Sequence, residues 1–375
     1  MLKFLADLTN VYRRQAVTID NHSLFLNRVV TLGILIFCFL VQAGTTFFKT
    51  PIDCYGDKEL KQFANIYCYV HSTYSIKNAD AHIQKHINVG YSNGSEIKHD
   101  YYQWVTLTLI AQAALTYLPA FLWKVWEGGR IKSLTLGLQS ACIPLEELAQ
   151  RKAQIKQFLI KGLGLQRLYL FRFAVCNCLN VCVVFIQLYF INLMVGDLFT
   201  IGFDFFKVLG SNPLQRSDRM AFIFPTMSKC LVPKVGPSGR EESRDFLCVL
   251  PFNLINEKMY TVLWVWFSLL AIFTSVSLLL SVMTLFCRPM RTTMLQMHCH
   301  PGHSKSIAEL VSKLDVADWF VLRQIGKNVN SSLFSEIIEE LGTSLKSTSH
   351  NQCKSCSVRN FNCKQSPMDG DATYV

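Results

Sequence analysis

Four long apolar segments divide the chain of 375 residues, at positions 29–48, 103–123, 173–196 and 259–287. Each has about the 20 residues or more that an α-helix needs to cross a bilayer. None of the four contains a charged side chain, so nothing within them opposes burial in lipid. The pattern therefore predicts an all-α membrane protein with four transmembrane helices.

The second apolar segment carries further membrane signals at its two ends. Tyr101, Tyr102 and Trp104 lie at its beginning and Trp123 lies at its end, and such aromatic side chains favour the membrane–water interfaces. Pro119 lies one turn before the end and leaves a carbonyl of the preceding turn without its usual donor. We expect a kink there, serving either as a hinge or only for packing.

The distribution of positive charge indicates how the chain is oriented. Residues 124–172 carry nine Lys and Arg against three Glu, and more basic residues lie in residues 1–28 and directly after the fourth segment. Because Lys and Arg favour the cytosolic side, we expect both termini and residues 124–172 in the cytosol. Residues 49–102 and 197–258 then form two extracellular loops. The net charge of +11 follows from this rule, so no nucleic-acid partner is expected.

The cytosolic segments contain patterns of shorter helices. The segment from Pro144 to Gly162 predicts a helix with the proline in its first turn and the glycine near its end. The C-terminal segment 288–342 predicts two or three short helices within residues 305–342. Residues 343–375 are rich in Ser, Thr, Asn, Gln and Lys, and this composition predicts a disordered tail.

The fourteen cysteines fall into two classes once the orientation is set. The loop 49–102 holds Cys54 and Cys68, and the loop 197–258 holds Cys230 and Cys248. Only these four face an oxidising environment, and they allow three pairings, within or between the loops. The spacing does not choose among the three. The other ten are expected as free thiols, with Cys176, Cys178 and Cys182 as small buried residues of the third segment.

Candidate chemistry is sparse elsewhere in the chain. The cysteines between positions 353 and 363 and the histidines between 298 and 303 lack a second CxxC pair, so we expect no metal site. The sequence has no phosphate-binding glycine loop and no nucleophile elbow, and we expect neither a cofactor nor enzymatic activity. Five polar side chains within or beside the apolar segments are expected to bond one helix to another: Gln42, Gln103, Gln112, Gln187 and Asn192.

Two short motifs indicate modification or binding. Asn93-Gly94-Ser95 is a glycosylation sequon in a predicted extracellular loop, so we predict a glycan at Asn93, although the neighbouring membrane segment limits access. The last residues, Thr373-Tyr374-Val375, suit a peptide that adds as a strand to a PDZ-type domain.

Several longer motifs lie along the chain, and together they resemble those of one family. They are YYQWV, which begins Tyr101, Tyr102, Gln103 and Trp104; PIDC at 51–54; CYVHSTY at 68–74; the segment from Pro119 to Gly129; FPTMSKC at 224–230; GPSG at 236–239; and DWFVLRQIGKN at 318–328. The chain closely resembles the innexins, the invertebrate gap-junction channel family. Connexins differ by having three cysteines in each loop, and pannexins lack the YYQWV motif.

The resemblance implies a ring of innexin subunits, alike or mixed and eight in the family manner, surrounding a pore in the plasma membrane. It implies that Cys54 pairs with Cys248 and Cys68 with Cys230. The N-terminal residues Met1, Leu2, Lys3, Phe4 and Leu5 would line the pore mouth, and the cytosolic helices would form a dome. Two rings on neighbouring cells would dock through their loops and pass ions and small molecules.

Two other functions remain open from the sequence. A glycan at Asn93 would hinder docking, which favours a non-junctional hemichannel that connects one cell with the outside. A four-span adhesion protein without a pore is the third possibility, although the loops lack the cysteine patterns of claudins and tetraspanins.

Overall fold

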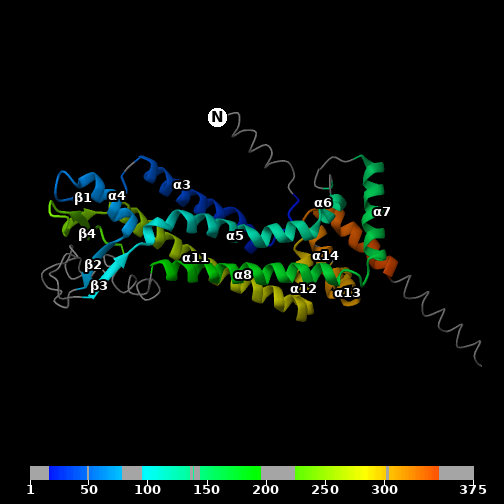
Figure 1. Ribbon diagram of the computed structural model, residues 1–375. Helices are drawn as coiled ribbons and strands as arrows, with labels where there is room; N and C mark the ends of the chain where they lie inside the picture. The colour runs from blue at the N-terminus through cyan, green and yellow to red at the C-terminus, as the bar shows by residue number, and fades with distance from the viewer. Residues whose placement is uncertain are drawn as a thin grey trace, which may run out of the picture. The chain divides into compact units, whose positions relative to one another are not determined.

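The computed structural model is mainly helical, with one sheet (Figure 1). It divides into two compact units, which we describe separately. One unit comprises residues 20–122 and 176–278, and the other comprises the remaining described residues. The structure describes residues 17–48, 50–77, 95–135, 138, 144–195, 224–300 and 304–345.

Four helices are long and apolar enough to cross a membrane, which confirms the predicted number. Each extends beyond its apolar segment at one end, where the flanking residues continue the same helix. The first is built from α2 (His22–Phe25), a π-helical stretch η1 (Leu26–Thr31) and α3 (Leu32–Phe48). The others are α5 (Val105–Glu127), α8 (Arg167–Val195) and α11 (Pro251–Phe286).

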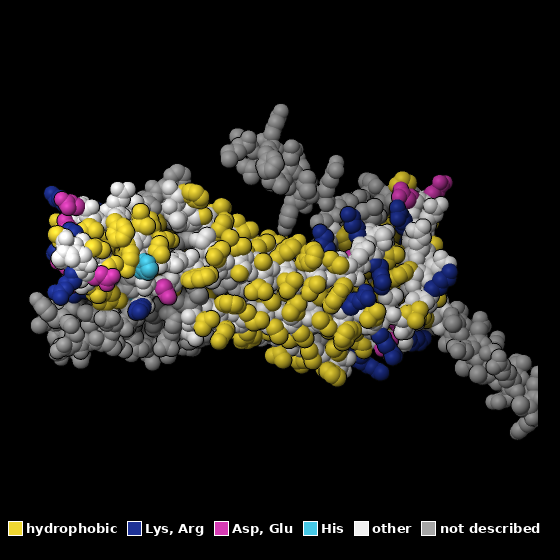
Figure 2. Space-filling view, in the orientation of Figure 1, with side chains coloured by type: hydrophobic (Ala, Val, Ile, Leu, Met, Phe, Trp, Pro, Cys, Tyr) yellow, Lys and Arg dark blue, Asp and Glu magenta, His cyan; other side chains and the backbone are white. Residues whose placement is uncertain are grey.

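Apolar side chains lie both inside this helix bundle and on its surface. Leu35, Leu109, Val184 and Phe267 belong to one buried cluster contributed by all four helices. Figure 2 shows that hydrophobic side chains also cover the membrane helices on the visible face. Exposing such a large apolar surface to water is unfavourable. We therefore expect lipid or a neighbouring subunit to cover it.

The two loops of the sequence combine into a single antiparallel sheet with the strand order β1-β5-β4-β2-β3. The first loop supplies β1 (Asp53–Tyr55), β2 (Thr73–Lys77) and β3 (Ser95–His99). The second supplies the hairpin β4 (Met227–Val235) and β5 (Glu241–Val249), which lies between β1 and β2. The apolar pattern predicted no strands here, so the sheet is an addition to the expected helical fold.

The turn of this hairpin explains the GPSG motif. Gly239 donates its backbone N–H to the Gly236 carbonyl at 2.9 Å, with Pro237 between them. Proline has the backbone angle that the second position of such a turn requires. Gly239 itself has φ of +75°, a conformation that glycine adopts without strain.

The other unit contains shorter helices, which we call the helical region. Its members are α6 (Arg130–Thr135), α7 (Leu145–Lys161), α12 (Arg288–Gln296), α13 (Ser304–Lys313), α14 (Val316–Gly326) and a last helix over residues 331–345. The helix α7 and the three helices after position 303 confirm the helices predicted from the sequence, although Pro144 lies just before α7 and not in its first turn. Figure 2 shows many of the Lys and Arg side chains on this unit.

Candidate functional site

The two loops are joined by two disulfides, one from β1 and one from the helix α4 (Lys61–His71). Cys54 on β1 is bonded to Cys248 on β5, and Cys68 on α4 is bonded to Cys230 on β4. This is the pairing that the family resemblance implies. We call β1 to β5 together with α4 the sheet region. Each disulfide links the first loop to the second, so the sheet region is one cross-linked body.

Both disulfides lie in an apolar core and are closed to solvent. Three of the four cysteines are fully buried and Cys230 is 2% exposed. They pack with Ile52, Val232 and Phe246 in one cluster. The backbone also approaches closely, because a Cβ added at Gly56 would lie 2.5 Å from the Phe246 ring.

Sulfur atoms of both disulfides lie close to one another in this core. One sulfur each from Cys54, Cys68 and Cys248 falls within 4.8 Å of the other two. Metal binding requires thiolates, and an oxidised cysteine is not a thiolate. The cluster is therefore a double cross-link and not a metal centre.

The YYQWV motif attaches α5 to the sheet region. The Tyr102 hydroxyl donates to the carbonyl of Cys68 at 3.1 Å, and Gln103 Nε2 donates to the carbonyl of Tyr69 at 2.6 Å. Tyr101 packs edge-on against Phe224 of the second loop, with ring centroids 5.6 Å apart. The next motif residue, Trp104, is 56% exposed, which suits a membrane–water interface.

His99 is a buried titratable group of the sheet region. Its side chain is 4% exposed and its Nε2 contacts the hydroxyl of Ser75. Burial lowers the pKa of His99 to about 4, and the nearby Asp100 opposes this only in part. The ring is therefore neutral at physiological pH.

Polar side chains connect the membrane helices, and the sequence analysis foresaw some of them. Gln187 on α8 donates to the carbonyl of Gln112 at 2.8 Å and to the Thr116 hydroxyl at 3.0 Å, both on α5. This confirms Gln187 as a bond between helices. Gln103 instead bonds to α4, as described above. The side-chain oxygens of three others have no hydrogen-bond partner among the described residues: Gln42, Gln112 and Asn192.

A second polar network at the start of the first membrane helix was missed. Asn180 of α8 accepts from Asn27 Nδ2 at 2.8 Å and donates to the Ser23 hydroxyl at 2.9 Å. Trp266 of α11 donates to the Thr31 hydroxyl at 3.0 Å. Asn27 and Thr31 lie in the π-helical stretch η1, a type of segment that often occurs at functional sites. Asn180 within an apolar run was the signal that could have revealed the network.

The segment after Pro119 is held by a buried carboxylate. Glu127 is 4% exposed, and its two oxygens accept the backbone N–H groups of Gly129 at 2.7 Å and Ile131 at 2.6 Å. The carboxylate thereby caps the beginning of α6, where a negative charge is favoured. Gly128 and Gly129 both have positive φ, which explains the two glycines of the motif. Pro119 is buried in a helix that continues past it, and a hinge there stays a prediction.

The cysteines of α8 correct one expectation. Cys176 is buried, but Cys178 and Cys182 are exposed. The last two are four residues apart and share a helix face, whereas Cys176 lies on the other side. Cys299 in the helical region is half-buried, and burial raises its pKa to about 11, so it is a thiol at neutral pH.

Several predicted site residues lie outside the described part of the chain. These are the pore-lining residues Met1 to Leu5, the sequon at Asn93, the cysteines from Cys353 to Cys363, and the terminal Thr373–Val375. Each stays a prediction.

The comparisons with known proteins agree over almost the whole chain. The Innexin family model matches residues 20–345. The chain belongs to the innexin family. Innexin inx2 of Schistocerca americana is 34% identical over 92% of this chain and 99% of its own length. Innexin inx2 and Innexin shaking-B of Drosophila melanogaster are 33% and 31% identical, over 94% of this chain and 99% and 97% of their own lengths.

Family membership gives the general activity of this innexin. It is a channel protein and not an enzyme, and it is a multi-pass protein of the plasma membrane that serves gap junctions. Proteins of the family form oligomeric channels with other innexins. The four membrane helices and the two disulfides agree with the family fold.

Proposed function

We propose that this innexin forms a ring, of eight subunits in the family manner, whose pore passes ions and small molecules between adjacent cells. The observation that carries the proposal is the sheet region, where both loops form one body joined by Cys54–Cys248 and Cys68–Cys230. A surface that is already ordered loses little conformational entropy when it binds. The sheet region therefore suits end-to-end docking with a like ring.

The uncharged membrane segments are compatible with a wide pore. In a ring, the pore is lined by side chains from every copy, so selectivity needs no charge buried within a single subunit. We propose that Met1, Leu2, Lys3, Phe4 and Leu5 narrow the inner mouth and that the helical region forms the cytosolic dome. The subunits would be alike or mixed, and lipid would cover the outer apolar faces.

The orientation belongs to the same proposal. Both termini and the segment 124–172 are placed in the cytosol by their excess of Lys and Arg, and the sheet region is placed outside. An epitope tag at either terminus should be reached by antibody only after the cells are permeabilised. Labelling of intact cells would contradict this orientation.

Paired-cell voltage clamp tests pore and docking together. Cells without endogenous coupling that express this innexin should show junctional conductance, and Cys54→Ala should abolish it because the cross-link between the loops is lost. Cys178→Ala is the matched control, since Cys178 is a free, exposed cysteine of α8. Surface labelling must show equal amounts of each variant. Coupling that persists in Cys54→Ala would contradict the role given to the disulfides.

A hemichannel is the alternative, and the Asn93 sequon is the observation that favours it. A glycan at Asn93 would hinder docking while leaving the pore of a single ring intact. Single-cell current and dye uptake without coupling between paired cells would support this alternative. Asn93→Gln should then create coupling, and an unchanged result would count against it.

The C-terminal residues Thr373, Tyr374 and Val375 are proposed to bind a PDZ-type domain. The free carboxylate and the apolar last side chain are the groups that such domains recognise. A peptide of the last ten or so residues should bind a PDZ panel, and the same peptide with Val375→Asp should not. Equal binding of both peptides would contradict the proposal.

A further inference from the structure

Asn328, at the end of the DWFVLRQIGKN motif, has a side-chain amide whose bonding capacity is completely used. Its Oδ1 accepts the backbone N–H of Thr18 at 2.7 Å and the Thr18 hydroxyl at 3.1 Å. Its Nδ2 donates to the Thr18 carbonyl at 3.0 Å and to the Gln324 carbonyl at 2.9 Å. An amide has two donors and two acceptor sites, and all four are filled. Asn328 is fully buried.

The next residue of the N-terminal segment, Ile19, is held by a residue of another helix. Trp123, at the inner end of α5, donates its Nε1–H to the Ile19 carbonyl at 3.1 Å and is fully buried. Its ring packs against Phe173 of α8, with centroids 4.9 Å apart, and Phe173 packs against Phe320 of α14 at 4.6 Å. We call Thr18, Ile19, Trp123 and Asn328 the Thr18 clamp.

The chemistry of the Thr18 clamp selects asparagine at position 328. Aspartate would place a second acceptor opposite the carbonyls of Thr18 and Gln324, and serine or alanine would not reach Thr18. Each of these changes would break the part-buried bonds to Thr18 and would leave the carbonyl of the buried Gln324 without its side-chain donor, which is unfavourable. The bonds between Asn328 and Thr18 involve no charged group, so salt should screen them little.

The Thr18 clamp lies where the chain passes from one compact unit to the other. Thr18 and Ile19 belong to the same unit as the helical region, whereas Asp20 belongs to the unit with the membrane bundle. The first membrane helix begins at His22, only three residues after Ile19. Because a helix is stiff, the position of its first turn affects the whole helix.

We propose that Asn328 is a positioning residue for channel gating, which makes the start of the first membrane helix follow the arrangement of the cytosolic helices. The inference rests on the proposed channel function. A rearrangement that breaks the Thr18 clamp releases the beginning of that helix, so the two states differ in these part-buried hydrogen bonds. Such a difference typically changes an equilibrium by roughly 5- to 100-fold.

The test compares serine substitutions at two nearby asparagines. Asn328→Ser removes the bonds to Thr18, whereas Asn330→Ser changes an exposed asparagine that precedes the last helix and leaves a residue that can cap it. Single-cell or junctional currents of each should be measured over a range of voltages, with surface labelling as a check on assembly. We expect Asn328→Ser to shift the open–closed equilibrium roughly 5- to 100-fold and Asn330→Ser to match the wild type.

Two milder variants keep the inference testable if Asn328→Ser does not reach the membrane. Trp123→Phe keeps the aromatic packing and removes only the bond to Ile19, and Thr18→Val removes only the hydroxyl bond to Asn328. Both should shift the equilibrium in one shared direction, by about 2- to 10-fold.

The outcomes separate the inference from the proposed function. Wild-type currents with unchanged voltage dependence in Trp123→Phe and Thr18→Val would overturn the role of the clamp while leaving the channel intact. An equal shift in Asn330→Ser would also overturn it, because the effect would then not be specific to the clamp. A wild-type protein without current in single and paired cells would instead overturn the proposed channel.

Discussion

The sheet region and the helical region both hold together segments that are far apart in sequence, but they do so by different chemistry. In the sheet region, disulfides bridge 194 and 162 residues. In the helical region the described cysteines Cys287 and Cys299 are free, and Asn328 reaches Thr18 by hydrogen bonds over 310 residues. The difference fits the proposed orientation, because disulfides persist outside the cell and thiols remain reduced in the cytosol.

The difference indicates which region can change shape. A covalent cross-link cannot open without a reductant, so the sheet region is suited to a constant docking surface. Hydrogen bonds and aromatic contacts can exchange during normal function. Rearrangement during gating is therefore expected in the helical region.

Removing a cross-link should give the largest effect. The Cys68–Cys230 bridge lies within the loop that Cys54–Cys248 closes. In the unfolded chain the two bridges together close a ring of about thirty residues, made of the segments 54–68 and 230–248. The double variant Cys68→Ala/Cys230→Ala opens that ring. The expected loss is about 3–4 kcal/mol in the free energy of unfolding. Thermal unfolding of purified protein would measure it. Cys299→Ala, in the helical region, is the control. An equal loss of stability in that control would contradict the assignment of the stabilising effect to the disulfide of the sheet region.

Acid should weaken the sheet region through His99. Above pH 6.5 the ring is neutral in the folded and the unfolded chain and has no effect. As the pH falls from about 6.5 towards 4, the unfolded chain gains a proton that the buried ring resists, so stability falls. The full loss is roughly 3 kcal/mol. Hydrogen exchange at pH 5 and 7 would measure it in β2 and β3.

A matched pair of histidine variants sharpens this prediction. His99→Gln should remove most of the pH dependence of the sheet region, whereas the exposed His71→Gln should leave it as in the wild type. A pH dependence that survives His99→Gln would show that another group is responsible.

The polar network of the membrane bundle should have an intermediate effect. Asn180→Ala leaves Asn27 and Ser23 without their partner in a buried site, and the expected cost is about 1–3 kcal/mol. Thermal stability in detergent would measure it. An exposed residue of the same helix, as in Cys182→Ala, should cost less than about 0.5 kcal/mol.

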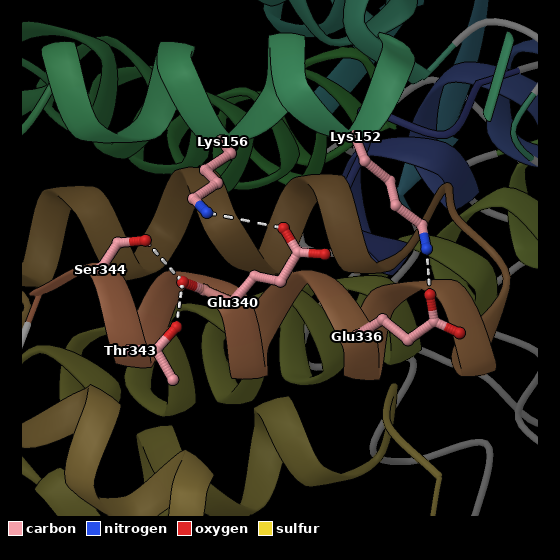
Figure 3. Close-up of polar contacts among 6 residues, drawn as sticks. All are labelled: Lys152, Lys156, Glu336, Glu340, Thr343 and Ser344. Atoms are coloured by element: carbon pink, nitrogen blue, oxygen red, sulfur yellow. Dashed lines mark hydrogen bonds and ion pairs between the residues drawn. The ribbon is translucent and has the colours of Figure 1, made fainter. Parts of the chain in front are cut away.

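Surface ion pairs of the helical region should have the smallest effect. Lys152 and Lys156 of α7 point towards Glu336 and Glu340 of the last helix, as Figure 3 shows. Both glutamates are at least half exposed, so each pair is expected to contribute at most about 1 kcal/mol. Lys156→Ala should lower the melting temperature slightly, and added salt should reduce the difference. A large, salt-independent effect would contradict this interpretation.

Hydropathy and charge predicted the membrane helices because lipid imposes a length and a composition that a single sequence reveals. The same holds for α7, whose flanking proline and glycine mark its two ends. The five-stranded sheet could not be predicted in this way. β5 begins with exposed charged residues, and β4 contains Pro233 at a position where a sheet strand pairs on one side only.

By itself the sequence determined the number of membrane helices, the four cysteines able to pair and, through its motifs, the family. Those properties depend on local composition or on strings of neighbouring residues. Only the tertiary structure showed that Tyr102 bonds to Cys68, that Glu127 caps α6 and that the Asn328 side chain bonds to Thr18. A hydrogen bond depends on distance in space, and a separation of 310 residues leaves no periodic signal in the chain.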